Sequence, residues 1–129
     1  MVNLKRAVLI GALFWVLIFF EVSILMFGLG LESGTLYYIV HYILSVILVA
    51  IASLIYFRGK VKAGAKEGLL LGLIMALTGI ILDLIITVPL FVKDYTAFFG
   101  DLYLWIGILL GIITVTLIGI KKFLSVTTP

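Results

Sequence analysis

Cysteine is absent from the 129 residues, and charged side chains are scarce, at 12% of the chain. Without cysteine the chain has no disulfide bonds, no thiolate metal ligands and no cysteine nucleophile. Soluble domains carry about 25% charged residues, so the low charge content excludes an ordinary soluble domain. Hydrophobic residues make up 65% of the chain, and the mean hydropathy is +1.43. This composition predicts an integral membrane protein.

Four apolar stretches are long enough to cross a bilayer, whose hydrocarbon core of about 30 Å requires about 20 helical residues. They cover residues 7–27, 36–57, 69–92 and 102–120. The segments between them are short, which favours antiparallel neighbours. The sequence therefore predicts an all-α, four-helix transmembrane bundle that forms one domain over residues 1–129, with little chain left for a soluble catalytic module.

Lysine and arginine are divided unequally between the two sides of these spans. One side holds Lys5, Arg6, Arg58, Lys60, Lys62, Lys66, Lys121 and Lys122, and the other side holds Lys93. The positive-inside rule places the richer side in the cytoplasm, so we expect both termini to be cytoplasmic in a multi-pass protein of a prokaryotic plasma membrane. We interpret the positive charge as a contact with anionic lipid headgroups and not with nucleic acid.

Three ionisable residues lie well inside the predicted spans: Glu21, His41 and Asp83. At 1.5 Å per residue, Glu21 and Asp83 each lie about 21 Å from the cytoplasmic edge, and His41 lies about 7.5 Å from the outer edge. All three therefore reach one layer in the outer half of the membrane. A charge at the bilayer centre costs about 2.5–3.5 kcal/mol even on a lenient scale, so these residues are candidates for a proton or substrate site.

More than one chemistry is compatible with this layer. Two acids close together in a medium of low dielectric constant can share a proton, which suits proton-coupled exchange. One histidine and two carboxylates can instead ligate a divalent cation, but no ligand pair has the close spacing of HExxH, so a metal stays an open question. No triad, oxyanion loop or phosphate cradle is recognisable, so an enzyme is the less favoured interpretation and no cofactor is expected.

Small residues recur at helical spacing on two of the predicted spans. The glycines of these stripes are Gly68, Gly72 and Gly79 on the third span and Gly107 and Gly111 on the fourth. Stripes of this kind are typical of helix packing or of a dimer contact in a membrane. The third span also contains Pro89, which has no N–H to bond to the Ile85 carbonyl, so we expect a kink there.

Two segments resemble the small multidrug resistance transporters. The run FEVSILMFGLGLESG around Glu21 resembles their first helix, in which an embedded acid followed by valine couples export to protons. The run FFGDLYLWIGILLGIITVTLIG resembles their last helix, which carries a glycine-rich dimer face. The resemblance implies that Glu21 binds protons and a cation and that Gly107 and Gly111 line a dimer contact. Asp83 and His41 are additional to that pattern.

A larger part of the chain resembles small uncharacterised four-span membrane proteins of bacteria and archaea. The segments that carry this likeness are EGLLLGLIMALTGIILDLIITVPLF and YTAFFGDLYLWIG. The likeness implies a four-span fold and no particular activity.

From these features we expect a small transporter or permeation protein, proton-linked through Glu21 and Asp83 with His41 assisting. We expect it to form a homodimer and to move a small cation or another small molecule. The alternative is an accessory or scaffold subunit of a membrane complex, whose buried polar groups only specify packing. A cavity at the polar layer would favour the transporter.

Overall fold

The structure is a computed structural model, and it describes residues 3–31, 34–58 and 61–127. Over these residues the chain is helical without any β-strand, and four helices are long and apolar enough to cross a membrane. The predicted all-α, four-helix transmembrane bundle is thus confirmed, and the chain is a multi-pass membrane protein.

Two of the four spans end in a π-helical segment. In chain order the elements are α1 (Leu4–Ser23), η1 (Ile24–Gly28), α2 (Thr35–Tyr56), α3 (Ala65–Leu82), η2 (Asp83–Val92), α4 (Tyr95–Phe99) and α5 (Leu102–Thr127). The third and fourth spans are longer than predicted, because α3 begins at Ala65 and α5 continues to Thr127. The prediction follows apolar residues alone, whereas these helices continue through the basic residues that flank them.

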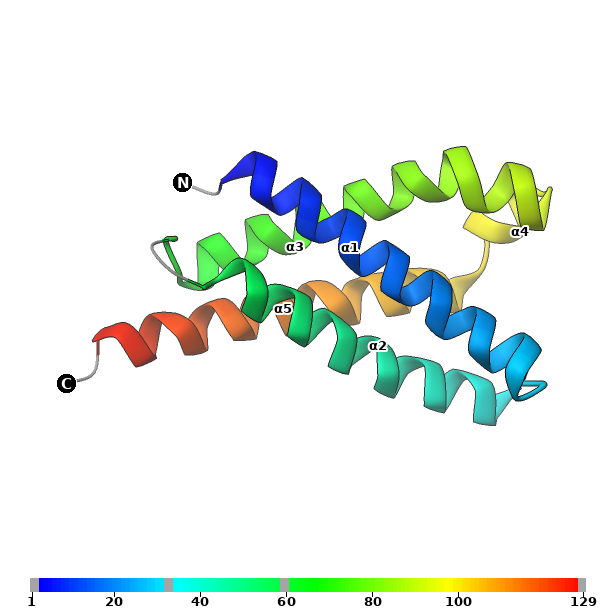
Figure 1. The fold of residues 1–129 in the computed structure, drawn as a ribbon, viewed down its shortest axis with the longest axis horizontal. Helices are drawn as coiled ribbons and strands as arrows, with labels where there is room; N and C mark the ends of the chain where they lie inside the picture. The colour runs from blue at the N-terminus through cyan, green and yellow to red at the C-terminus, as the bar shows by residue number, and fades with distance from the viewer. Residues whose placement is uncertain (1–2, 32–33, 59–60, 128–129) are drawn as a thin grey trace.

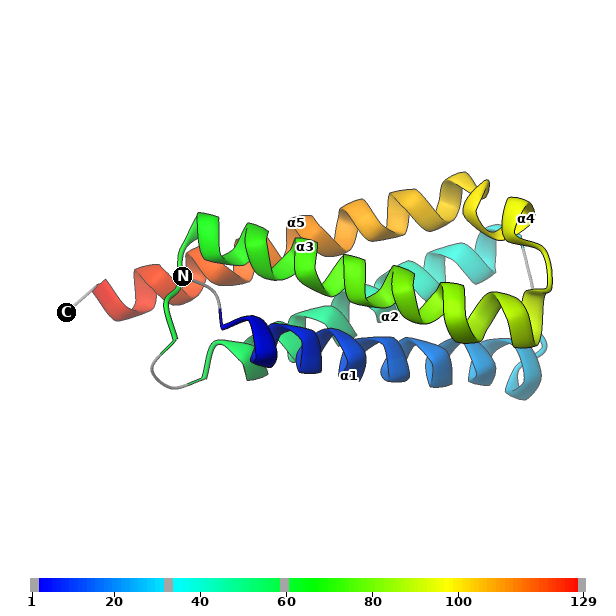
Figure 2. The ribbon, with the colours of Figure 1, turned by 90° about the horizontal axis from the view of Figure 1, so that it is seen from above.

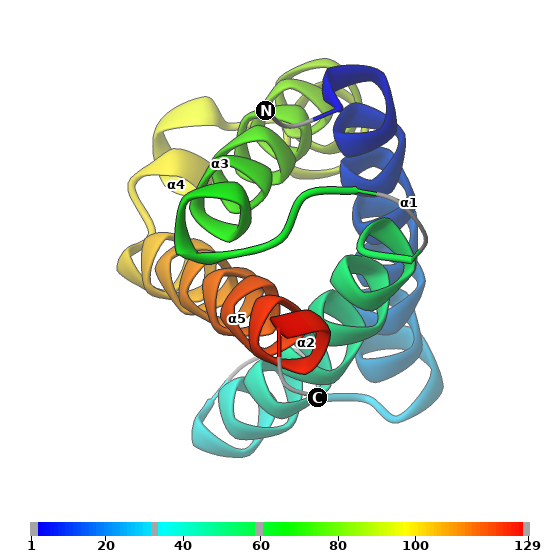
Figure 3. The same cartoon turned by 90° about the vertical axis from the view of Figure 1, so that its left-hand side faces the viewer.

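The four long helices form a ring in which α1 contacts α2 and α3, and α5 also contacts α2 and α3. Figure 3 shows this order from one end of the bundle. Neighbours that follow each other in the chain are antiparallel, whereas α1 runs parallel to α3 and α2 runs parallel to α5 (Figures 1 and 2).

The two ends of the bundle differ in what they carry. The start of α1, the end of α2, the start of α3 and the end of α5 lie at one end, which we call the terminal end (Figure 1). The opposite end carries η1 and α4, and we call it the loop end. The basic residues predicted for the cytoplasmic side lie at the terminal end, except Lys60, which lies outside the described residues. Which end faces the cytoplasm stays a prediction.

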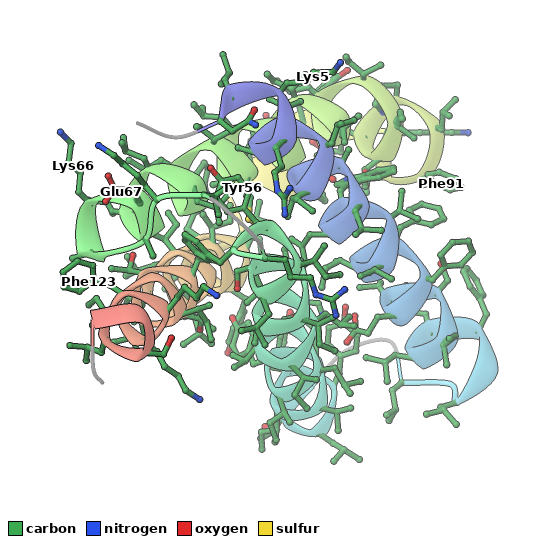
Figure 4. The ribbon with its side chains drawn as sticks, turned by 60° about the vertical axis from the view of Figure 1, so that its left-hand side comes forward. Lys5, Tyr56, Lys66, Glu67, Phe91 and Phe123 are labelled. Carbon is green, nitrogen blue, oxygen red and sulfur yellow. The ribbon has the colours of Figure 1, made fainter. Side chains whose placement is uncertain are left out.

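A packed core fills the half of the bundle near the terminal end. Its buried residues come from every long helix and from the residue after α2: Ala7, Ile10, Val49, Ala52, Tyr56, Phe57, Leu71, Met75 and Val115. Figure 4 labels Tyr56 between the helices, where its side chain is 1% exposed, and shows Lys66 on the outside. This half of the bundle is therefore closed.

Arg6 joins the start of α1 to the end of α2. Its Nη2 donates to the carbonyls of Ile55 over 2.8 Å and Arg58 over 3.1 Å. The last carbonyls of a helix have no helical partner, and the helix dipole favours a cation near them. Arg6 therefore binds two backbone acceptors at the end of α2, of which the Ile55 carbonyl also accepts from the Arg58 amide over 3.3 Å.

Glycine allows α3 and α5 to approach closely in the same half. A Cβ atom added at Gly68 would lie 2.8 Å from the Thr116 Cα, and one added at Gly72 would lie 3.2 Å from the Ile112 Cα. A real Cβ at Gly68 would force the two backbones apart. Gly68 and Gly72 thus make a helix contact inside one chain, and a dimer contact at this stripe stays a prediction.

The third span widens around Pro89 into η2. In a π-helix each amide donates to the carbonyl five residues earlier, so the carbonyl that Pro89 leaves free is that of Leu84 and not that of Ile85. The hydroxyl of Tyr95 on α4 donates to the Leu84 carbonyl over 3.1 Å. Where the sequence predicts a kink with a free acceptor, the structure has a widened helix whose acceptor is occupied.

Candidate functional site

Glu21 of α1 and His41 of α2 form a pair across the gap between their helices. His41 Nδ1 lies 2.9 Å from Glu21 Oε2 and 3.1 Å from Oε1. The Glu21 side chain is 7% exposed and that of His41 is 21% exposed. A hydrogen bond between the two groups needs one proton, on Nδ1 or on the carboxyl group, because an ionised carboxylate can only accept hydrogen bonds.

The ring of Tyr37, one helical turn before His41, packs on one face of the imidazole. The two rings are stacked, with centroids 5.6 Å apart and planes tilted by 13°. His41 Nε2 has no hydrogen-bond partner in the described part of the chain, and His41 lines the cavity described below. The imidazole therefore has one nitrogen on Glu21 and the other available to a ligand.

Asp83, the first residue of η2, has different partners. Trp15 Nε1 of α1 donates to Asp83 Oδ1 over 2.9 Å, and the Thr87 hydroxyl donates to the same oxygen over 2.7 Å. Oδ2 makes no hydrogen bond to any described residue, and Asp83 lines the same cavity as His41. The site thus offers one free carboxylate oxygen and one free imidazole nitrogen.

The structure brings Glu21 together with His41 but does not join Glu21 to Asp83. No hydrogen bond links the two acids within the described residues, and each has its own partner. Glu21 follows Trp15 by six residues, which is a rotation of about 240° around α1. Trp15 consequently faces α3 and η2, and Glu21 faces α2. The expectation that the two acids lie at one depth does not imply that they share one face.

Trp15 is not among the predicted site residues, although the sequence contains a signal for it. Gly11, Trp15 and Phe19 recur every four residues, which places them on one face of α1. A Cβ atom at Gly11 would lie 3.1 Å from the Met75 Cα of α3, and Phe19 packs on Phe91 of η2. The face that carries Trp15 is therefore the face that α1 presents to the third span.

A cavity of about 660 Å³ lies between the helices in the half near the loop end. Its wall extends from Phe98, Asp101 and Tyr103 at the loop end to the buried core residues Val49 and Val115. Pockets for small molecules typically measure about 300–1,000 Å³, so the cavity has the size of a binding site. Glu21 is not part of the wall and lies behind His41.

The remaining glycines of the predicted stripes lie at this cavity. A Cβ atom added at Gly79 or Gly111 would meet no atom within 4 Å, and both residues line the cavity wall. A Cβ atom at Gly107 would lie 3.3 Å from the Tyr42 ring. Gly79 and Gly111 therefore make no close helix contact of the kind that the stripes predict, because the helices diverge toward the loop end.

Side-chain contacts close the gaps between neighbouring helices around the cavity. The pair of Glu21 and His41 closes the gap between α1 and α2. The hydrogen bond from Trp15 to Asp83 closes the gap between α1 and η2. Phe91 of η2, which Figure 4 labels beside α1, also lies in this gap, and its ring centroid is 5.3 Å from that of Phe19.

The gap between α2 and α5 is closed by tyrosines. The rings of Tyr38 and Tyr103 stack with centroids 3.8 Å apart, and the Tyr42 hydroxyl donates to the Tyr103 carbonyl over 2.7 Å. Near α4, Trp105 Nε1 donates to the Phe99 carbonyl over 2.6 Å. Of these aromatic residues, Tyr38, Tyr42 and Tyr103 line the cavity, and Phe99 and Trp105 do not.

The described residues contain no group of three or more His, Asp or Glu side chains that could hold a metal ion. Glu21, His41 and Asp83 are thus not arranged as one ligand set, since Asp83 has its partners on another side of the cavity.

Comparison of the chain with models of protein families, with curated proteins and with solved structures found no match.

Proposed function

We propose that this protein is a small proton-linked transporter of a prokaryotic plasma membrane that binds a small cation in the cavity. The observation that carries the proposal is a cavity with one free carboxylate oxygen, on Asp83, and one free imidazole nitrogen, on His41. The cavity ends on the packed core. A closed end of this kind supports the proposal, because the binding site of a transporter opens to one side of the membrane at a time.

Asp83 is the cation ligand in this proposal. Its free oxygen, Oδ2, supplies negative charge, while Trp15 and Thr87 hold the other oxygen in place. The aromatic rings on the cavity wall add a favourable surface for a cation, because the face of an aromatic ring carries partial negative charge. A bound cation thus meets both an acid and aromatic rings.

Glu21 and His41 form the proton site. An imidazole can accept a proton at one nitrogen while it releases a proton from the other, so His41 connects the cavity to Glu21. A cation beside Asp83 repels positive charge on the imidazole through a medium of low dielectric constant, where such forces are strong. Binding of the cation therefore favours release of the proton, and this competition couples the two fluxes.

The alternative is an accessory or scaffold subunit whose polar pairs only specify packing. It is favoured by one observation: Glu21 has His41 as a partner, and Asp83 has Trp15. A scaffold has no need of a cavity, however, and Gly79 and Gly111 leave that space open. The homodimer belongs to the proposal as well, although Gly68 and Gly72 are occupied by contacts inside the chain.

Proton flux in proteoliposomes tests the proposal. A gradient of a small organic cation, chosen from a panel that starts with tetramethylammonium, should drive proton movement reported by an internal pH dye. Asp83→Asn should abolish cation binding, whereas Glu21→Gln should keep binding and lose the proton flux. Glu67→Gln serves as the control, because Glu67 is an acid at the terminal end that does not line the cavity.

Two results would favour the scaffold. One is a wild-type protein that moves no protons with any cation of the panel. The other is a set of acid variants with altered thermal stability and unchanged flux.

A further inference from the structure

We propose that the ligand of the cavity is a linear dication, an α,ω-diamine, whose two ammonium groups bind at Asp83 and at Asp101. The site at Asp83 rests on the proposed function. The second site, at Asp101, rests on the charges of the cavity wall and on the different depths of the two carboxylates.

The cavity wall carries negative charge that no basic side chain balances. Among the described residues that line the cavity, Asp83 and Asp101 supply the carboxylates, and none is a lysine or an arginine. His41, which also lines the cavity, has a carboxylate partner of its own in Glu21. Neither aspartate forms an ion pair within the described part of the chain. A monovalent cation at Asp83 would therefore leave the charge of Asp101 unbalanced.

Asp101 lies at the mouth of the cavity. It follows α4 and directly precedes α5, at the loop end of the bundle (Figure 1). Its Oδ1 accepts a hydrogen bond from the Tyr103 amide over 3.0 Å, so the side chain caps the start of α5. Its Oδ2 makes no hydrogen bond to any described residue, and Asp101 is exposed to solvent as well as lining the cavity. Asp101 thus offers a free carboxylate oxygen where the cavity meets water.

Asp83 lies deeper in the bundle than Asp101. It is the first of the ten residues of η2, which ends at Val92 near the loop end. Ten helical residues rise up to about 15 Å, so the two carboxylates lie at different levels of the cavity. A metal ion is too compact to contact both, and the described residues contain no group of three ligands for one. Two positive charges separated by a chain of atoms can contact both.

The cavity wall also suits the chain that joins the two charges. Tyr37, Tyr38 and Phe98 line the cavity, and Tyr38 is held in place by its stacking on Tyr103. Methylene groups pack favourably against such rings, and an ammonium group is attracted to the face of a ring. A ligand with a charge at each end is soluble in water and avoids the hydrocarbon core. We therefore infer that it enters from the aqueous phase at the loop end, past Asp101.

Asp94 provides a matched control for Asp101. Its Oδ1 accepts from the Ala97 amide over 3.0 Å, so it caps α4 as Asp101 caps α5. Asp94 is also an exposed acid at the loop end, but it does not line the cavity. Asparagine caps a helix about as well as aspartate does. Asp101→Asn and Asp94→Asn therefore each remove one charge and keep the helix start, and they differ in their place relative to the cavity.

Calorimetry with the full chain in lipid nanodiscs tests the proposal. The ligands are α,ω-diaminoalkanes from diaminopropane to diaminodecane, and each is compared with the alkylamine of the same chain length at neutral pH and physiological ionic strength. The proteins are the wild type, Asp101→Asn and Asp94→Asn. Asp101→Ser is added as a second variant, because serine also caps a helix without a charge.

We expect diamines above a certain length to bind the wild type about fivefold more tightly than the matching alkylamines. This ratio corresponds to about 1 kcal/mol, the attraction of two unit charges 4 Å apart in bulk water. Asp101→Asn and Asp101→Ser should each abolish the difference and leave alkylamine binding unchanged, because charges separated by more than the Debye length of about 8 Å are largely screened. Asp94→Asn should resemble the wild type with both kinds of ligand.

Equal affinities of the wild type for diamines and alkylamines of every length would overturn the dication and leave the cation site at Asp83 standing. Equal weakening of diamine binding by Asp101→Asn and Asp94→Asn would also overturn it, because the effect would then belong to the general charge of the loop end. Failure of every amine to bind the wild type would overturn both this inference and the proposed function.

Discussion

The pairing of Glu21 with His41 and not with Asp83 predicts a specific pattern of coupling energies. The Glu21 carboxyl group is almost completely buried, and both of its oxygens lie within 3.1 Å of His41 Nδ1. Glu21→Leu alone leaves Nδ1 without a partner, and His41→Leu alone leaves the carboxyl group without one. An unpaired buried polar group costs about 1–3 kcal/mol, so each single variant should be destabilised by an amount in this range.

The double variant removes both groups and leaves neither unpaired, so its destabilisation should be smaller than the sum of the two single effects. Hydrogen bonds between membrane helices are worth about 0.6 kcal/mol on average and about 1.7 kcal/mol at most. We expect the coupling of Glu21 to His41 to lie in the upper part of this range, because the contact involves both carboxyl oxygens and is shielded from solvent.

The cycle of Glu21→Leu with Asp83→Leu is the contrasting measurement. The two acids share no hydrogen-bond partner, so their effects should add to within about 0.3–0.5 kcal/mol. Reversible unfolding in bicelles, followed by circular dichroism, provides the free energies for both cycles. A coupling of Glu21 to Asp83 that equals or exceeds that of Glu21 to His41 would refute the assignment and would mean that the acids share a proton.

Three further predictions concern the framework. Gly68→Ala should cost about 1–3 kcal/mol because the new methyl group meets the backbone of α5, whereas Gly79→Ala should leave the melting temperature unchanged or raise it, because the site is open and alanine favours a helix. Equal destabilisation of the two variants would contradict the placement of the cavity. Arg6→Ala should cost about 1–2 kcal/mol through the loss of its hydrogen bonds to the Ile55 and Arg58 carbonyls at the end of α2, and Lys5→Ala, an exposed control, should change stability by less than about 0.5 kcal/mol. A reporter active only in the cytoplasm should give signal when fused to either terminus, and signal from fusions in α4 instead would reverse the orientation.

The depth of a residue in the membrane can be predicted from the sequence, whereas the neighbour that each face of a helix contacts can be predicted only in part. Glu21 and His41 are expected in one layer because the rise per residue of a helix is constant, and the two side chains are indeed in contact. The partner of Asp83 depends on which face of α1 meets the third span. Apolar residues lie around the whole of α1, so hydrophobic periodicity does not make that choice, and Trp15 is missed although it recurs with Gly11 and Phe19 every four residues.

Residues of one type also have different roles for reasons that lie outside the sequence. Gly68 and Gly79 belong to one stripe, yet Gly68 touches the backbone of α5 and Gly79 faces empty space, because α3 and α5 approach near one end and diverge near the other. Pro89 predicts an irregular helix, but the π-helical form and the use of the Leu84 carbonyl depend on α4, which folds back to bring Tyr95 against it.

The concentration of buried side chains in the terminal half has a consequence for how the bundle opens, although Leu25 of η1 and Val88 of η2 are also buried near the loop end. Near Val49, Leu71 and Val115, separation of the helices exposes buried side chains from all sides, so opening there requires a free energy close to that of global unfolding. Near Tyr42 and Trp15, a few hydrogen bonds and ring contacts across a hollow oppose the same movement. Amide protons of one and the same helix should therefore fall into two classes of exchange with solvent, slow toward the terminal end and fast toward the loop end. The mouth of the bundle can fluctuate while its base keeps the fold.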